Sequence, residues 1–163
     1  MNVISLRSDC ERCAALCCVG LAFDRSDLFA IDKEAGSPCP NLNACGRCRI
    51  HSNLADVGFR GCVQYDCLGA GQRVVQDFFG GKSWLENADL LAPMMEAFWV
   101  TRIAHEHLEL LEVATSFPLS RHQEDRRRML FFCMIDAGLS VTRVRQVAHE
   151  VMGWLKELSG DKE

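Results

Sequence analysis

The chain has 163 residues, a formal net charge of −4, 48% hydrophobic residues and 25% charged residues. This balance is that of an ordinary globular protein of one domain or two small ones, and it argues against disorder and against general nucleic-acid binding. The unusual feature is the cysteine content. Nine of the ten cysteines lie between Cys10 and Cys67, and Cys133 stands apart.

The first part of the chain, residues 1–80, contains only short predicted elements. We expect a helix over 9–19, a strand over 28–32, and one or two helical turns over 52–57 that end at Gly58. Elements of this length bury little apolar surface. Such a segment usually needs a staple, and metal is the staple that a reducing compartment allows.

The remaining residues, 81–163, are predicted to be helical. Ser83 and Glu86 have the spacing of a capping box, which predicts a helix over 84–114. Pro93 lies inside this range and predicts a kink or a break, because proline lacks the backbone N–H that a helix interior needs.

Two further helices follow, with clear start and stop signals. Ser120 and Gln123 form a second capping box, and the helix that it opens should run to about Asp136 and end at Gly138; Ser140 can cap the last helix. Apolar residues recur in the last helix at spacings of 3 and 4: Val141, Val144, Ala148, Val151, Leu155 and Leu158. This seam predicts an antiparallel bundle with the seam in its core; a homodimer through this helix is the alternative.

The early cysteines have spacings typical of metal ligands. Cys10, Cys13 and Cys17 are three and four residues apart, so on a helix they would share one face. Cys18 would then point about 100° away from Cys17, which disfavours a shared tetrahedral ion. The pattern therefore predicts two metal sites or one bridged cluster.

Clustered cysteines form disulfides or bind metal according to the redox compartment. The chain shows no apolar run of signal-peptide length, and no stretch approaches the roughly 20 apolar residues that span a bilayer. We therefore expect a cytoplasmic protein with reduced thiols. Thiolates select soft metals, and the spacing here leaves zinc and iron–sulfur clusters both open.

Four motifs carry a family resemblance: Cys13-x3-Cys17-Cys18, Cys39-Pro-Asn-Leu, Cys48-Arg-Ile-His51 and Cys62-x4-Cys67. They resemble the YkgJ-like cysteine-cluster family, whose members are described as zinc- or iron-chelating proteins, and a related cluster occurs in flagellin lysine methylases. The stretches LCCV, FAIDK-x-AG-x-PCPNL, GF-x-GC and YDC-x-GAGQ-x-V are still more similar to the cysteine-rich region that precedes the repeats of some bacterial pentapeptide-repeat proteins. This chain has no pentapeptide tract of its own.

The resemblance implies a bacterial protein that holds a metal or an iron–sulfur cluster. It assigns eight ligands: Cys10, Cys13, Cys17, Cys18, Cys39, Cys48, Cys62 and Cys67. Cys45 has no counterpart in the family and is a spare or alternative ligand. His51, three residues after Cys48, is a second-tier candidate, as a ligand or hydrogen-bond donor, or else a surface histidine.

Other residues receive structural interpretations. His105 and Glu109 share a helix face that we expect to be solvated, and Cys133 is expected to be a buried structural thiol. Gly69 and Gly71 indicate a tight turn that lets the backbone approach the metal site.

The sequence as a whole predicts a mainly α protein, with an irregular, metal-stapled, cysteine-rich module (1–80) packed on a small antiparallel helical bundle (81–163). The expected function is metal binding with a structural, metal-handling or electron-transfer role. A cluster-dependent enzyme, similar to the methylases, and a zinc-stapled protein-interaction module stay open. We expect no nucleic-acid or membrane partner and identify no catalytic residue; a protein partner, and a monomer or a homodimer, stay open.

Overall fold

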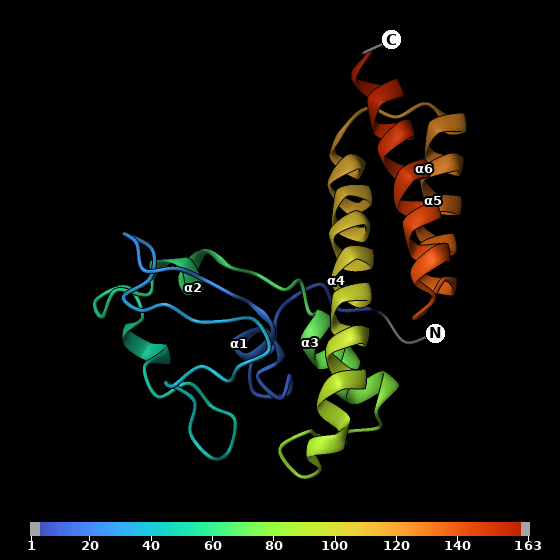
Figure 1. The fold of residues 1–163 in the computed structure, drawn as a ribbon. Helices are drawn as coiled ribbons and strands as arrows, with labels where there is room; N and C mark the ends of the chain where they lie inside the picture. Colours follow the sequence, from blue (N-terminus) through green and yellow to red (C-terminus); the bar gives the residue numbers. More distant parts are fainter. Residues whose placement is uncertain (1–3, 161–163) are drawn as a thin grey trace. The chain divides into compact units, whose positions relative to one another are not determined.

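The structure is a computed structural model that describes residues 4–160, and it is mainly helical, as predicted (Figure 1). The chain forms two compact units, Met1–Phe98 and Trp99–Glu163, so the division falls inside the long helix α4 (Leu91–Val113). The compositional boundary at residues 80 and 81 stays a prediction.

The first unit consists of short helices joined by irregular backbone. Before α4 none of its elements exceeds five residues: α1 (Leu16–Gly20), the 3₁₀ turn η1 (His51–Asn53), α2 (Arg60–Gln64), α3 (Ala70–Arg73), the π-helical turn η2 (Val74–Phe78) and the 3₁₀ turn η3 (Ala88–Leu90). Within residues 4–160 the only β pairing is two isolated bridges, Phe23 with Lys33 and Leu42 with Cys48.

The helix predicted over 9–19 is wrong for most of its length, because α1 begins only at Leu16. Ala14 and Ala15 have positive φ angles of 48° and 55°, which interrupt a right-handed helical path. The indole Nε1 of Trp84 donates a hydrogen bond to the Ala14 carbonyl at 2.7 Å. A contact distant in sequence thus stabilises a turn that local propensity does not predict.

The strand predicted over 28–32 is also wrong. This segment bends, and pairing is confined to Phe23 and Lys33, whose backbones exchange two hydrogen bonds of 3.0 and 2.8 Å. The rings of Phe23 and Phe29 stack with centroids 4.2 Å apart inside the loop. The turn expected before Gly58 is confirmed: η1 and further turns lead to this glycine, whose φ is +85°.

The core of the first unit gathers α1, α3, η2 and the first turns of α4. One cluster of buried residues there comprises Leu16, Cys67, Ala70, Val74, Val75, Met94, Ala97 and Phe98, and Cys13, Ala15, Val19 and Phe59 are buried as well. Polar contacts between distant segments add to this core, such as the bond from Trp84 to Ala14.

The helix predicted to start after Ser83 begins instead at Leu91. Ser83 closes only a short turn, and Asn87 caps η3 by accepting a hydrogen bond from the Asp89 N–H at 3.1 Å. Pro93 is therefore in the first turn of α4, where a backbone N–H has no partner within the helix. The proline fits a helix start and requires no kink.

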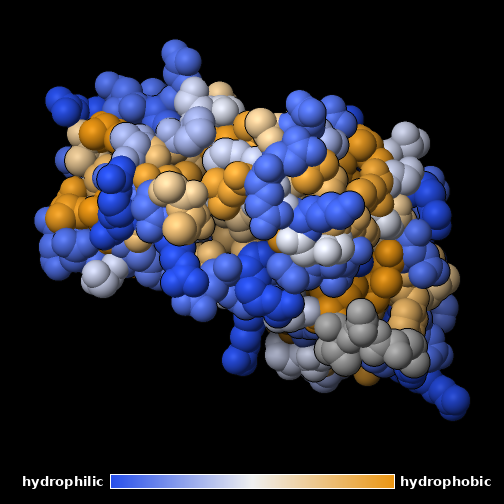
Figure 2. Space-filling model, turned by 90° about the horizontal axis from the view of Figure 1, so that it is seen from below, coloured by the Kyte–Doolittle hydropathy of each residue, from blue (hydrophilic) through white to orange (hydrophobic). Residues whose placement is uncertain are grey.

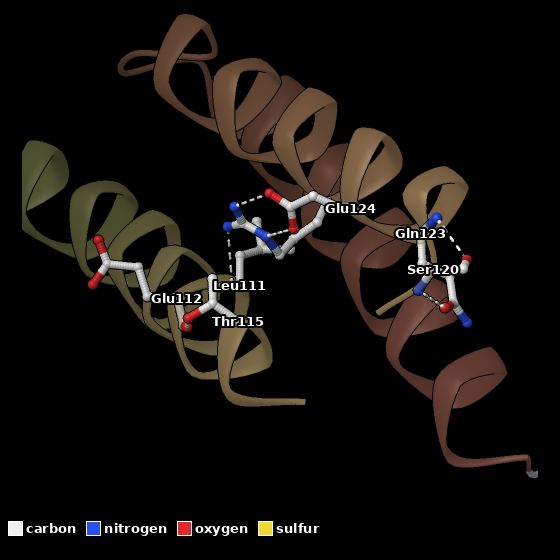
Figure 3. Close-up of polar contacts among 7 residues, drawn as sticks. Leu111, Glu112, Thr115, Ser120, Gln123 and Glu124 are labelled. Carbon is white, nitrogen blue, oxygen red and sulfur yellow. Dashed lines mark hydrogen bonds and ion pairs between the residues drawn. The ribbon is translucent and has the colours of Figure 1, made fainter. Parts of the chain in front are cut away.

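The second unit contains the rest of α4, η4 (Ala114–Ser116), α5 (Arg121–Asp136) and α6 (Val141–Ser159), with successive helices running in opposite directions (Figure 1). The capping box is confirmed: Ser120 Oγ accepts from the Gln123 N–H at 3.3 Å, and Gln123 Oε1 accepts from the Ser120 N–H at 2.8 Å (Figure 3). Ser140 caps α6 as predicted.

The core of the second unit includes the fully buried Leu108, Leu111, Leu130, Val144 and Val151. The predicted seam of α6 is confirmed in its middle, where Val144, Ala148 and Val151 are buried. It is wrong at its start, because Val141 is 45% exposed, and it omits the buried Val147 and Trp154.

His105 departs from its predicted place on a solvated helix face, because its side chain is fully buried. Thr101, one helical turn earlier on α4, is also buried. Cys133 is half-buried on α5, so the burial expected for this thiol is only partial.

The surface carries scattered apolar side chains. Phe117, Val113 and Phe132 of the second unit are more than half exposed. Figure 2 shows hydrophobic and hydrophilic residues interspersed on the face that it presents. None of the helices in residues 4–160 has the length and apolar character needed to cross a membrane.

Candidate metal centre

The segment that carries the first two candidate ligands is held by two glutamine side chains. Gln72 accepts a hydrogen bond from the Asp9 N–H at 3.0 Å and donates to the Arg7 carbonyl at 2.6 Å. Gln76 donates to the Arg12 carbonyl at 3.2 Å. Residues 7–12 are thus fixed against α3 and η2 by side-chain amides rather than by secondary structure of their own.

The two glycines expected near the site do allow a close approach of backbone. A Cβ at Gly71 would lie 2.7 Å from Cys13 Cβ, which is closer than real Cβ contacts allow. Gly69 has a φ of +78° and passes next to the Ser5 carbonyl. Only residues without side chains fit at these positions, so the prediction of a tight turn near the cysteines is confirmed.

The vicinal pair on α1 is closer than helix geometry led us to expect. Cys17 Sγ and Cys18 Sγ are 3.9 Å apart, so the expectation that the two side chains diverge is wrong. Two thiolates bound to one tetrahedral zinc ion, with Zn–S bonds of about 2.3 Å, are separated by roughly 3.8 Å. The pair is therefore spaced for one ion or for two adjacent ones.

A cavity of about 250 Å³ opens among the candidate ligands of the first unit. Six predicted site residues line it: Cys10, Cys13, Cys17, Cys18, Cys48 and His51. Two charged side chains, Glu11 and Arg47, also line the cavity. The helix face predicted for Cys10, Cys13 and Cys17 does not exist, yet the three residues meet at this cavity.

Hydrogen bonds place two of the remaining ligands. The Cys39 N–H donates to the Cys18 carbonyl at 3.1 Å, so the extended segment beside Pro38 pairs with α1. The thiol of Cys67, buried in the core, lies 3.1 Å from the hydroxyl of Ser8. Segments far apart in the chain thus converge on one region.

The candidate thiols influence one another electrostatically. The hydrogen bond with the Cys18 thiol is the main effect that raises the pKa of Cys17. Burial and the charges of Cys13 and Cys67 raise it further. Burial raises the pKa of Cys48, and the charges of Cys18, Cys39 and Cys10 add to this effect.

Cys62 is influenced by some of the same thiols as Cys48. Burial, and then the charges of Cys18, Cys39 and Cys48, raise the pKa of the Cys62 thiol to about 11. Cys18 and Cys39 thus act in the same direction on Cys48 and on Cys62.

Cys10 lies at the exposed edge of the cavity, next to His51. A hydrogen bond with the Cys13 thiol, and to a smaller extent a hydrogen bond and the charge of His51, lower the pKa of Cys10 to about 6. Burial and the charge of Asp9 act in the opposite direction. His51 lines the cavity and is exposed, and its role as a ligand stays a prediction.

Cys45 is one of four early cysteines outside the cavity lining, with Cys39, Cys62 and Cys67. Its side chain is exposed and does not line the cavity, although Gly46 and Arg47 do. Its N–H donates to Asn43 Oδ1 at 2.9 Å in a turn. Its role as a spare or alternative ligand stays a prediction.

The thiols face one another without forming a closed coordination set. Across residues 4–160, no three cysteine, histidine, aspartate or glutamate side chains are arranged so that they could hold a metal ion together. All ten cysteines are free thiols. The thiols thus surround a cavity at separations too wide for three of them to contact one ion.

Lys33 is the residue of this region that sequence reasoning missed. Its side chain is buried, and its Nζ donates three hydrogen bonds to backbone carbonyls. A lysine in the charged stretch around Asp32 and Glu34 has the sequence signature of a surface residue. The bridge to Phe23, a contact ten residues away, is what turns it inward.

No protein-family model matches the chain, and no solved structure matches it. The chain is similar to the uncharacterized protein YybG of Bacillus subtilis (strain 168), with 39% identity over 126 residues. The alignment covers 77% of this chain and 45% of the relative, so the chain spans less than half of that protein's length. At most 37 residues of the chain lie outside the alignment, which therefore includes residues 38–126 and parts of both units.

Proposed function

We propose that the first unit binds metal through cysteine thiolates, as an iron–sulfur cluster or as zinc ions, in a cytoplasmic protein. The observation that supports this most directly is the cavity of the first unit, which is lined by five of the eight candidate thiols: Cys10, Cys13, Cys17, Cys18 and Cys48. Membership of the YkgJ-like family stays a prediction and is consistent with the same eight positions.

The donor set suits a soft metal. Thiolates prefer zinc, iron–sulfur clusters or cuprous copper over magnesium or calcium. The 3.9 Å separation of Cys17 Sγ and Cys18 Sγ is compatible with ligation of neighbouring metal atoms or of one ion. Since no three ligands within residues 4–160 are arranged to hold an ion, the proposal includes a small closure of the loops around the cavity when metal binds.

The role that the fold supports best is structural. The first unit has short elements before α4, and the free energy of metal binding would add to its folding free energy. Cys10 and Cys62 are exposed, so the ligands also reach solvent, as metal handling or electron transfer would require. In each of these roles the residues that hold the metal are the same.

Elemental analysis combined with an acid-labile sulfide assay, on protein purified without oxygen, tests the proposal. An iron–sulfur protein would be brown and contain sulfide, whereas a zinc protein would be colourless. The variant Cys39→Ala should lose metal, and Cys45→Ala is the matched control that should retain it. Fewer than one metal per chain, together with thiol counts that reveal disulfides, would contradict the proposal.

A cluster-dependent enzyme is the second candidate, and the cavity is the observation that favours it. Besides the thiols it presents Glu11, Arg47 and His51, which could bind a small polar substrate beside the metal. Azide added to the cobalt-substituted protein would change its visible spectrum if a coordination position is open to the cavity. An unchanged spectrum would leave the structural role as the better account.

A further inference from the structure

Lys33 is a buried cation with an unusual set of partners. The side chain is 8% exposed, and Nζ donates to the carbonyls of Val19 at 3.0 Å, Leu21 at 2.6 Å and Glu34 at 3.0 Å. Within residues 4–160 this ammonium makes no ion pair with a carboxylate. A buried charge is costly unless it is compensated, so the carbonyls alone leave its positive charge without a counter-charge.

The ammonium lies next to the backbone that carries Cys18, because Nζ bonds to the carbonyl of the following residue, Val19. Burial lowers the pKa of Lys33, and the charges of Cys39, Cys18 and Cys17 oppose that effect in this order. The influence is mutual at Cys18, because the charge of Lys33 is among the effects that lower the pKa of that thiol, after the hydrogen bond with Cys17. The ring of Phe23, 5.7 Å from Nζ, is a further partner that favours a cation.

The backbone around Lys33 is tied to the same end of α1. The Lys33 backbone pairs with that of Phe23, and the Gly36 N–H donates to the Val19 carbonyl at 2.9 Å. Nζ also donates to the Val19 carbonyl and to the carbonyl of Leu21, the first residue after the helix. The loop therefore holds the carbonyl end of the short helix that carries the vicinal cysteines.

We infer that Lys33 is a positioning residue of the proposed metal centre. Its hydrogen bonds fix the carbonyl end of α1, the short helix that carries Cys17 and Cys18, and its buried ammonium supplies a counter-charge for the thiolates of these two residues and of Cys39. Four thiolates around one divalent ion carry a net charge of −2, and a nearby buried cation offsets part of it. This inference rests on the proposed metal binding.

Two variants separate the charge of Lys33 from its hydrogen bonds. Lys33→Gln keeps a hydrogen-bond donor and removes the charge, whereas Lys33→Arg keeps both the charge and donors. Lys82, an exposed lysine of the same unit, gives the matched control Lys82→Gln. Each full-length protein is titrated with Zn²⁺ in competition with a chromogenic chelator, and its metal content after anaerobic purification is measured alongside.

We expect Lys33→Gln to bind Zn²⁺ about 10- to 100-fold more weakly than the unsubstituted protein, the range seen when groups next to metal ligands are removed. Lys33→Arg should recover most of the affinity, and Lys82→Gln should bind normally. If the centre is an iron–sulfur cluster, Lys33→Gln should also lower its midpoint potential, because the lost positive charge favoured the more negative, reduced state.

The outcomes distinguish this inference from the proposed function. Unchanged affinity and potential in Lys33→Gln would overturn the role of Lys33, and so would an equal loss in Lys33→Gln and Lys33→Arg, since the cause would then be packing. A Lys33→Gln protein that carries no metal, beside a loaded Lys33→Arg protein, would support it. Failure of the unsubstituted protein to bind any metal would instead overturn the proposed function itself.

Discussion

The two units of this chain reach defined structures by different physical routes. The second unit is built from helices of 16 and 19 residues, α5 and α6, with side-chain caps at Ser120 and Ser140 and a core of aliphatic side chains. In the described part of the first unit, from residue 4 onward, no element before α4 is longer than five residues. It is held by bonds between residues more than 60 positions apart, such as Asp9 with Gln72 and Ala14 with Trp84.

This difference indicates where metal would matter. Local caps and side-chain burial act within the second unit whether or not metal is bound. In the first unit, the helices before α4 are short, and bonds between distant segments have to help offset the loss of chain entropy. The proposed metal centre therefore belongs to the unit that has most need of a further source of folding free energy.

The largest effect should follow from metal removal. Structural zinc contributes on the order of 10 kcal/mol to the folding of small domains, so chelation should unfold the segment that contains the candidate ligands. Hydrogen exchange measured by mass spectrometry should show loss of protection over residues 10–67 and retained protection in α5 and α6. Loss of protection in both units alike, or in neither, would contradict the proposed division of roles.

A buried leucine provides the opposite perturbation. Leu130 on α5 is fully buried, and Leu130→Ala should destabilise the second unit by about 2–5 kcal/mol through lost burial and a residual cavity. Urea unfolding monitors the change, and Leu110→Ala, at a position 38% exposed, is the matched control with a small expected effect. Metal content should stay normal in both variants; a loss of metal in Leu130→Ala would show that the units are coupled.

A methyl group added at Gly71 tests the close approach between α3 and Cys13. Gly71→Ala would place a Cβ 2.7 Å from Cys13 Cβ, and the resulting overpacking should cost about 1–3 kcal/mol and lower the metal content. Gly153 of α6 has open space where its Cβ would be, so Gly153→Ala should instead stabilise its helix by up to about 1 kcal/mol. Equal effects of the two substitutions would show that the contact with Cys13 is not limiting.

The same contrast explains what the sequence could predict. The cap at Ser120, the end near Gly138 and the antiparallel helices follow from signals within one helical turn, and they are confirmed. In the first unit the helix over 9–19 fails because left-handed Ala14 and Ala15 depend on Trp84, which is 70 positions away from Ala14. Interactions of this range leave no periodic pattern in a single sequence.

The candidate site was predictable in composition but not in geometry. Cysteine spacing and the family resemblance selected the residues, and the structure brings them to one region by a route that helix periodicity did not indicate. Ser83 shows the same limit, because its capping-box pattern closes only a turn while Asn87 caps the element before α4. Lys33 had no sequence signal, since its partners are backbone carbonyls, which every residue type provides.

The smallest effect concerns the link between α4 and α5 in the second unit. Arg127 makes a two-point ion pair with Glu124, with N···O distances of 2.7 and 2.8 Å, and also donates to the Leu111 carbonyl at 3.2 Å (Figure 3). The hydrogen bond from Arg127 is the main reason why the pKa of Glu124 is lowered. A folded-state pKa below the unfolded value means that the pair stabilises the fold above the ordinary glutamate range and ceases to do so as the pH falls through the lowered value.

Glu124→Gln removes this pH dependence. At neutral pH the variant should be slightly less stable than the unsubstituted protein, because the pair is exposed on one side and screened by solvent. The two proteins should become equally stable in acid, where Glu124 is protonated. Urea unfolding over a pH series measures the difference, with Asp125→Asn as the neighbouring control. A difference in unfolding free energy that stays constant with pH would mean that helix propensity, and not the bond to Arg127, is its cause. Arg127 would then hold the Leu111 carbonyl without help from Glu124.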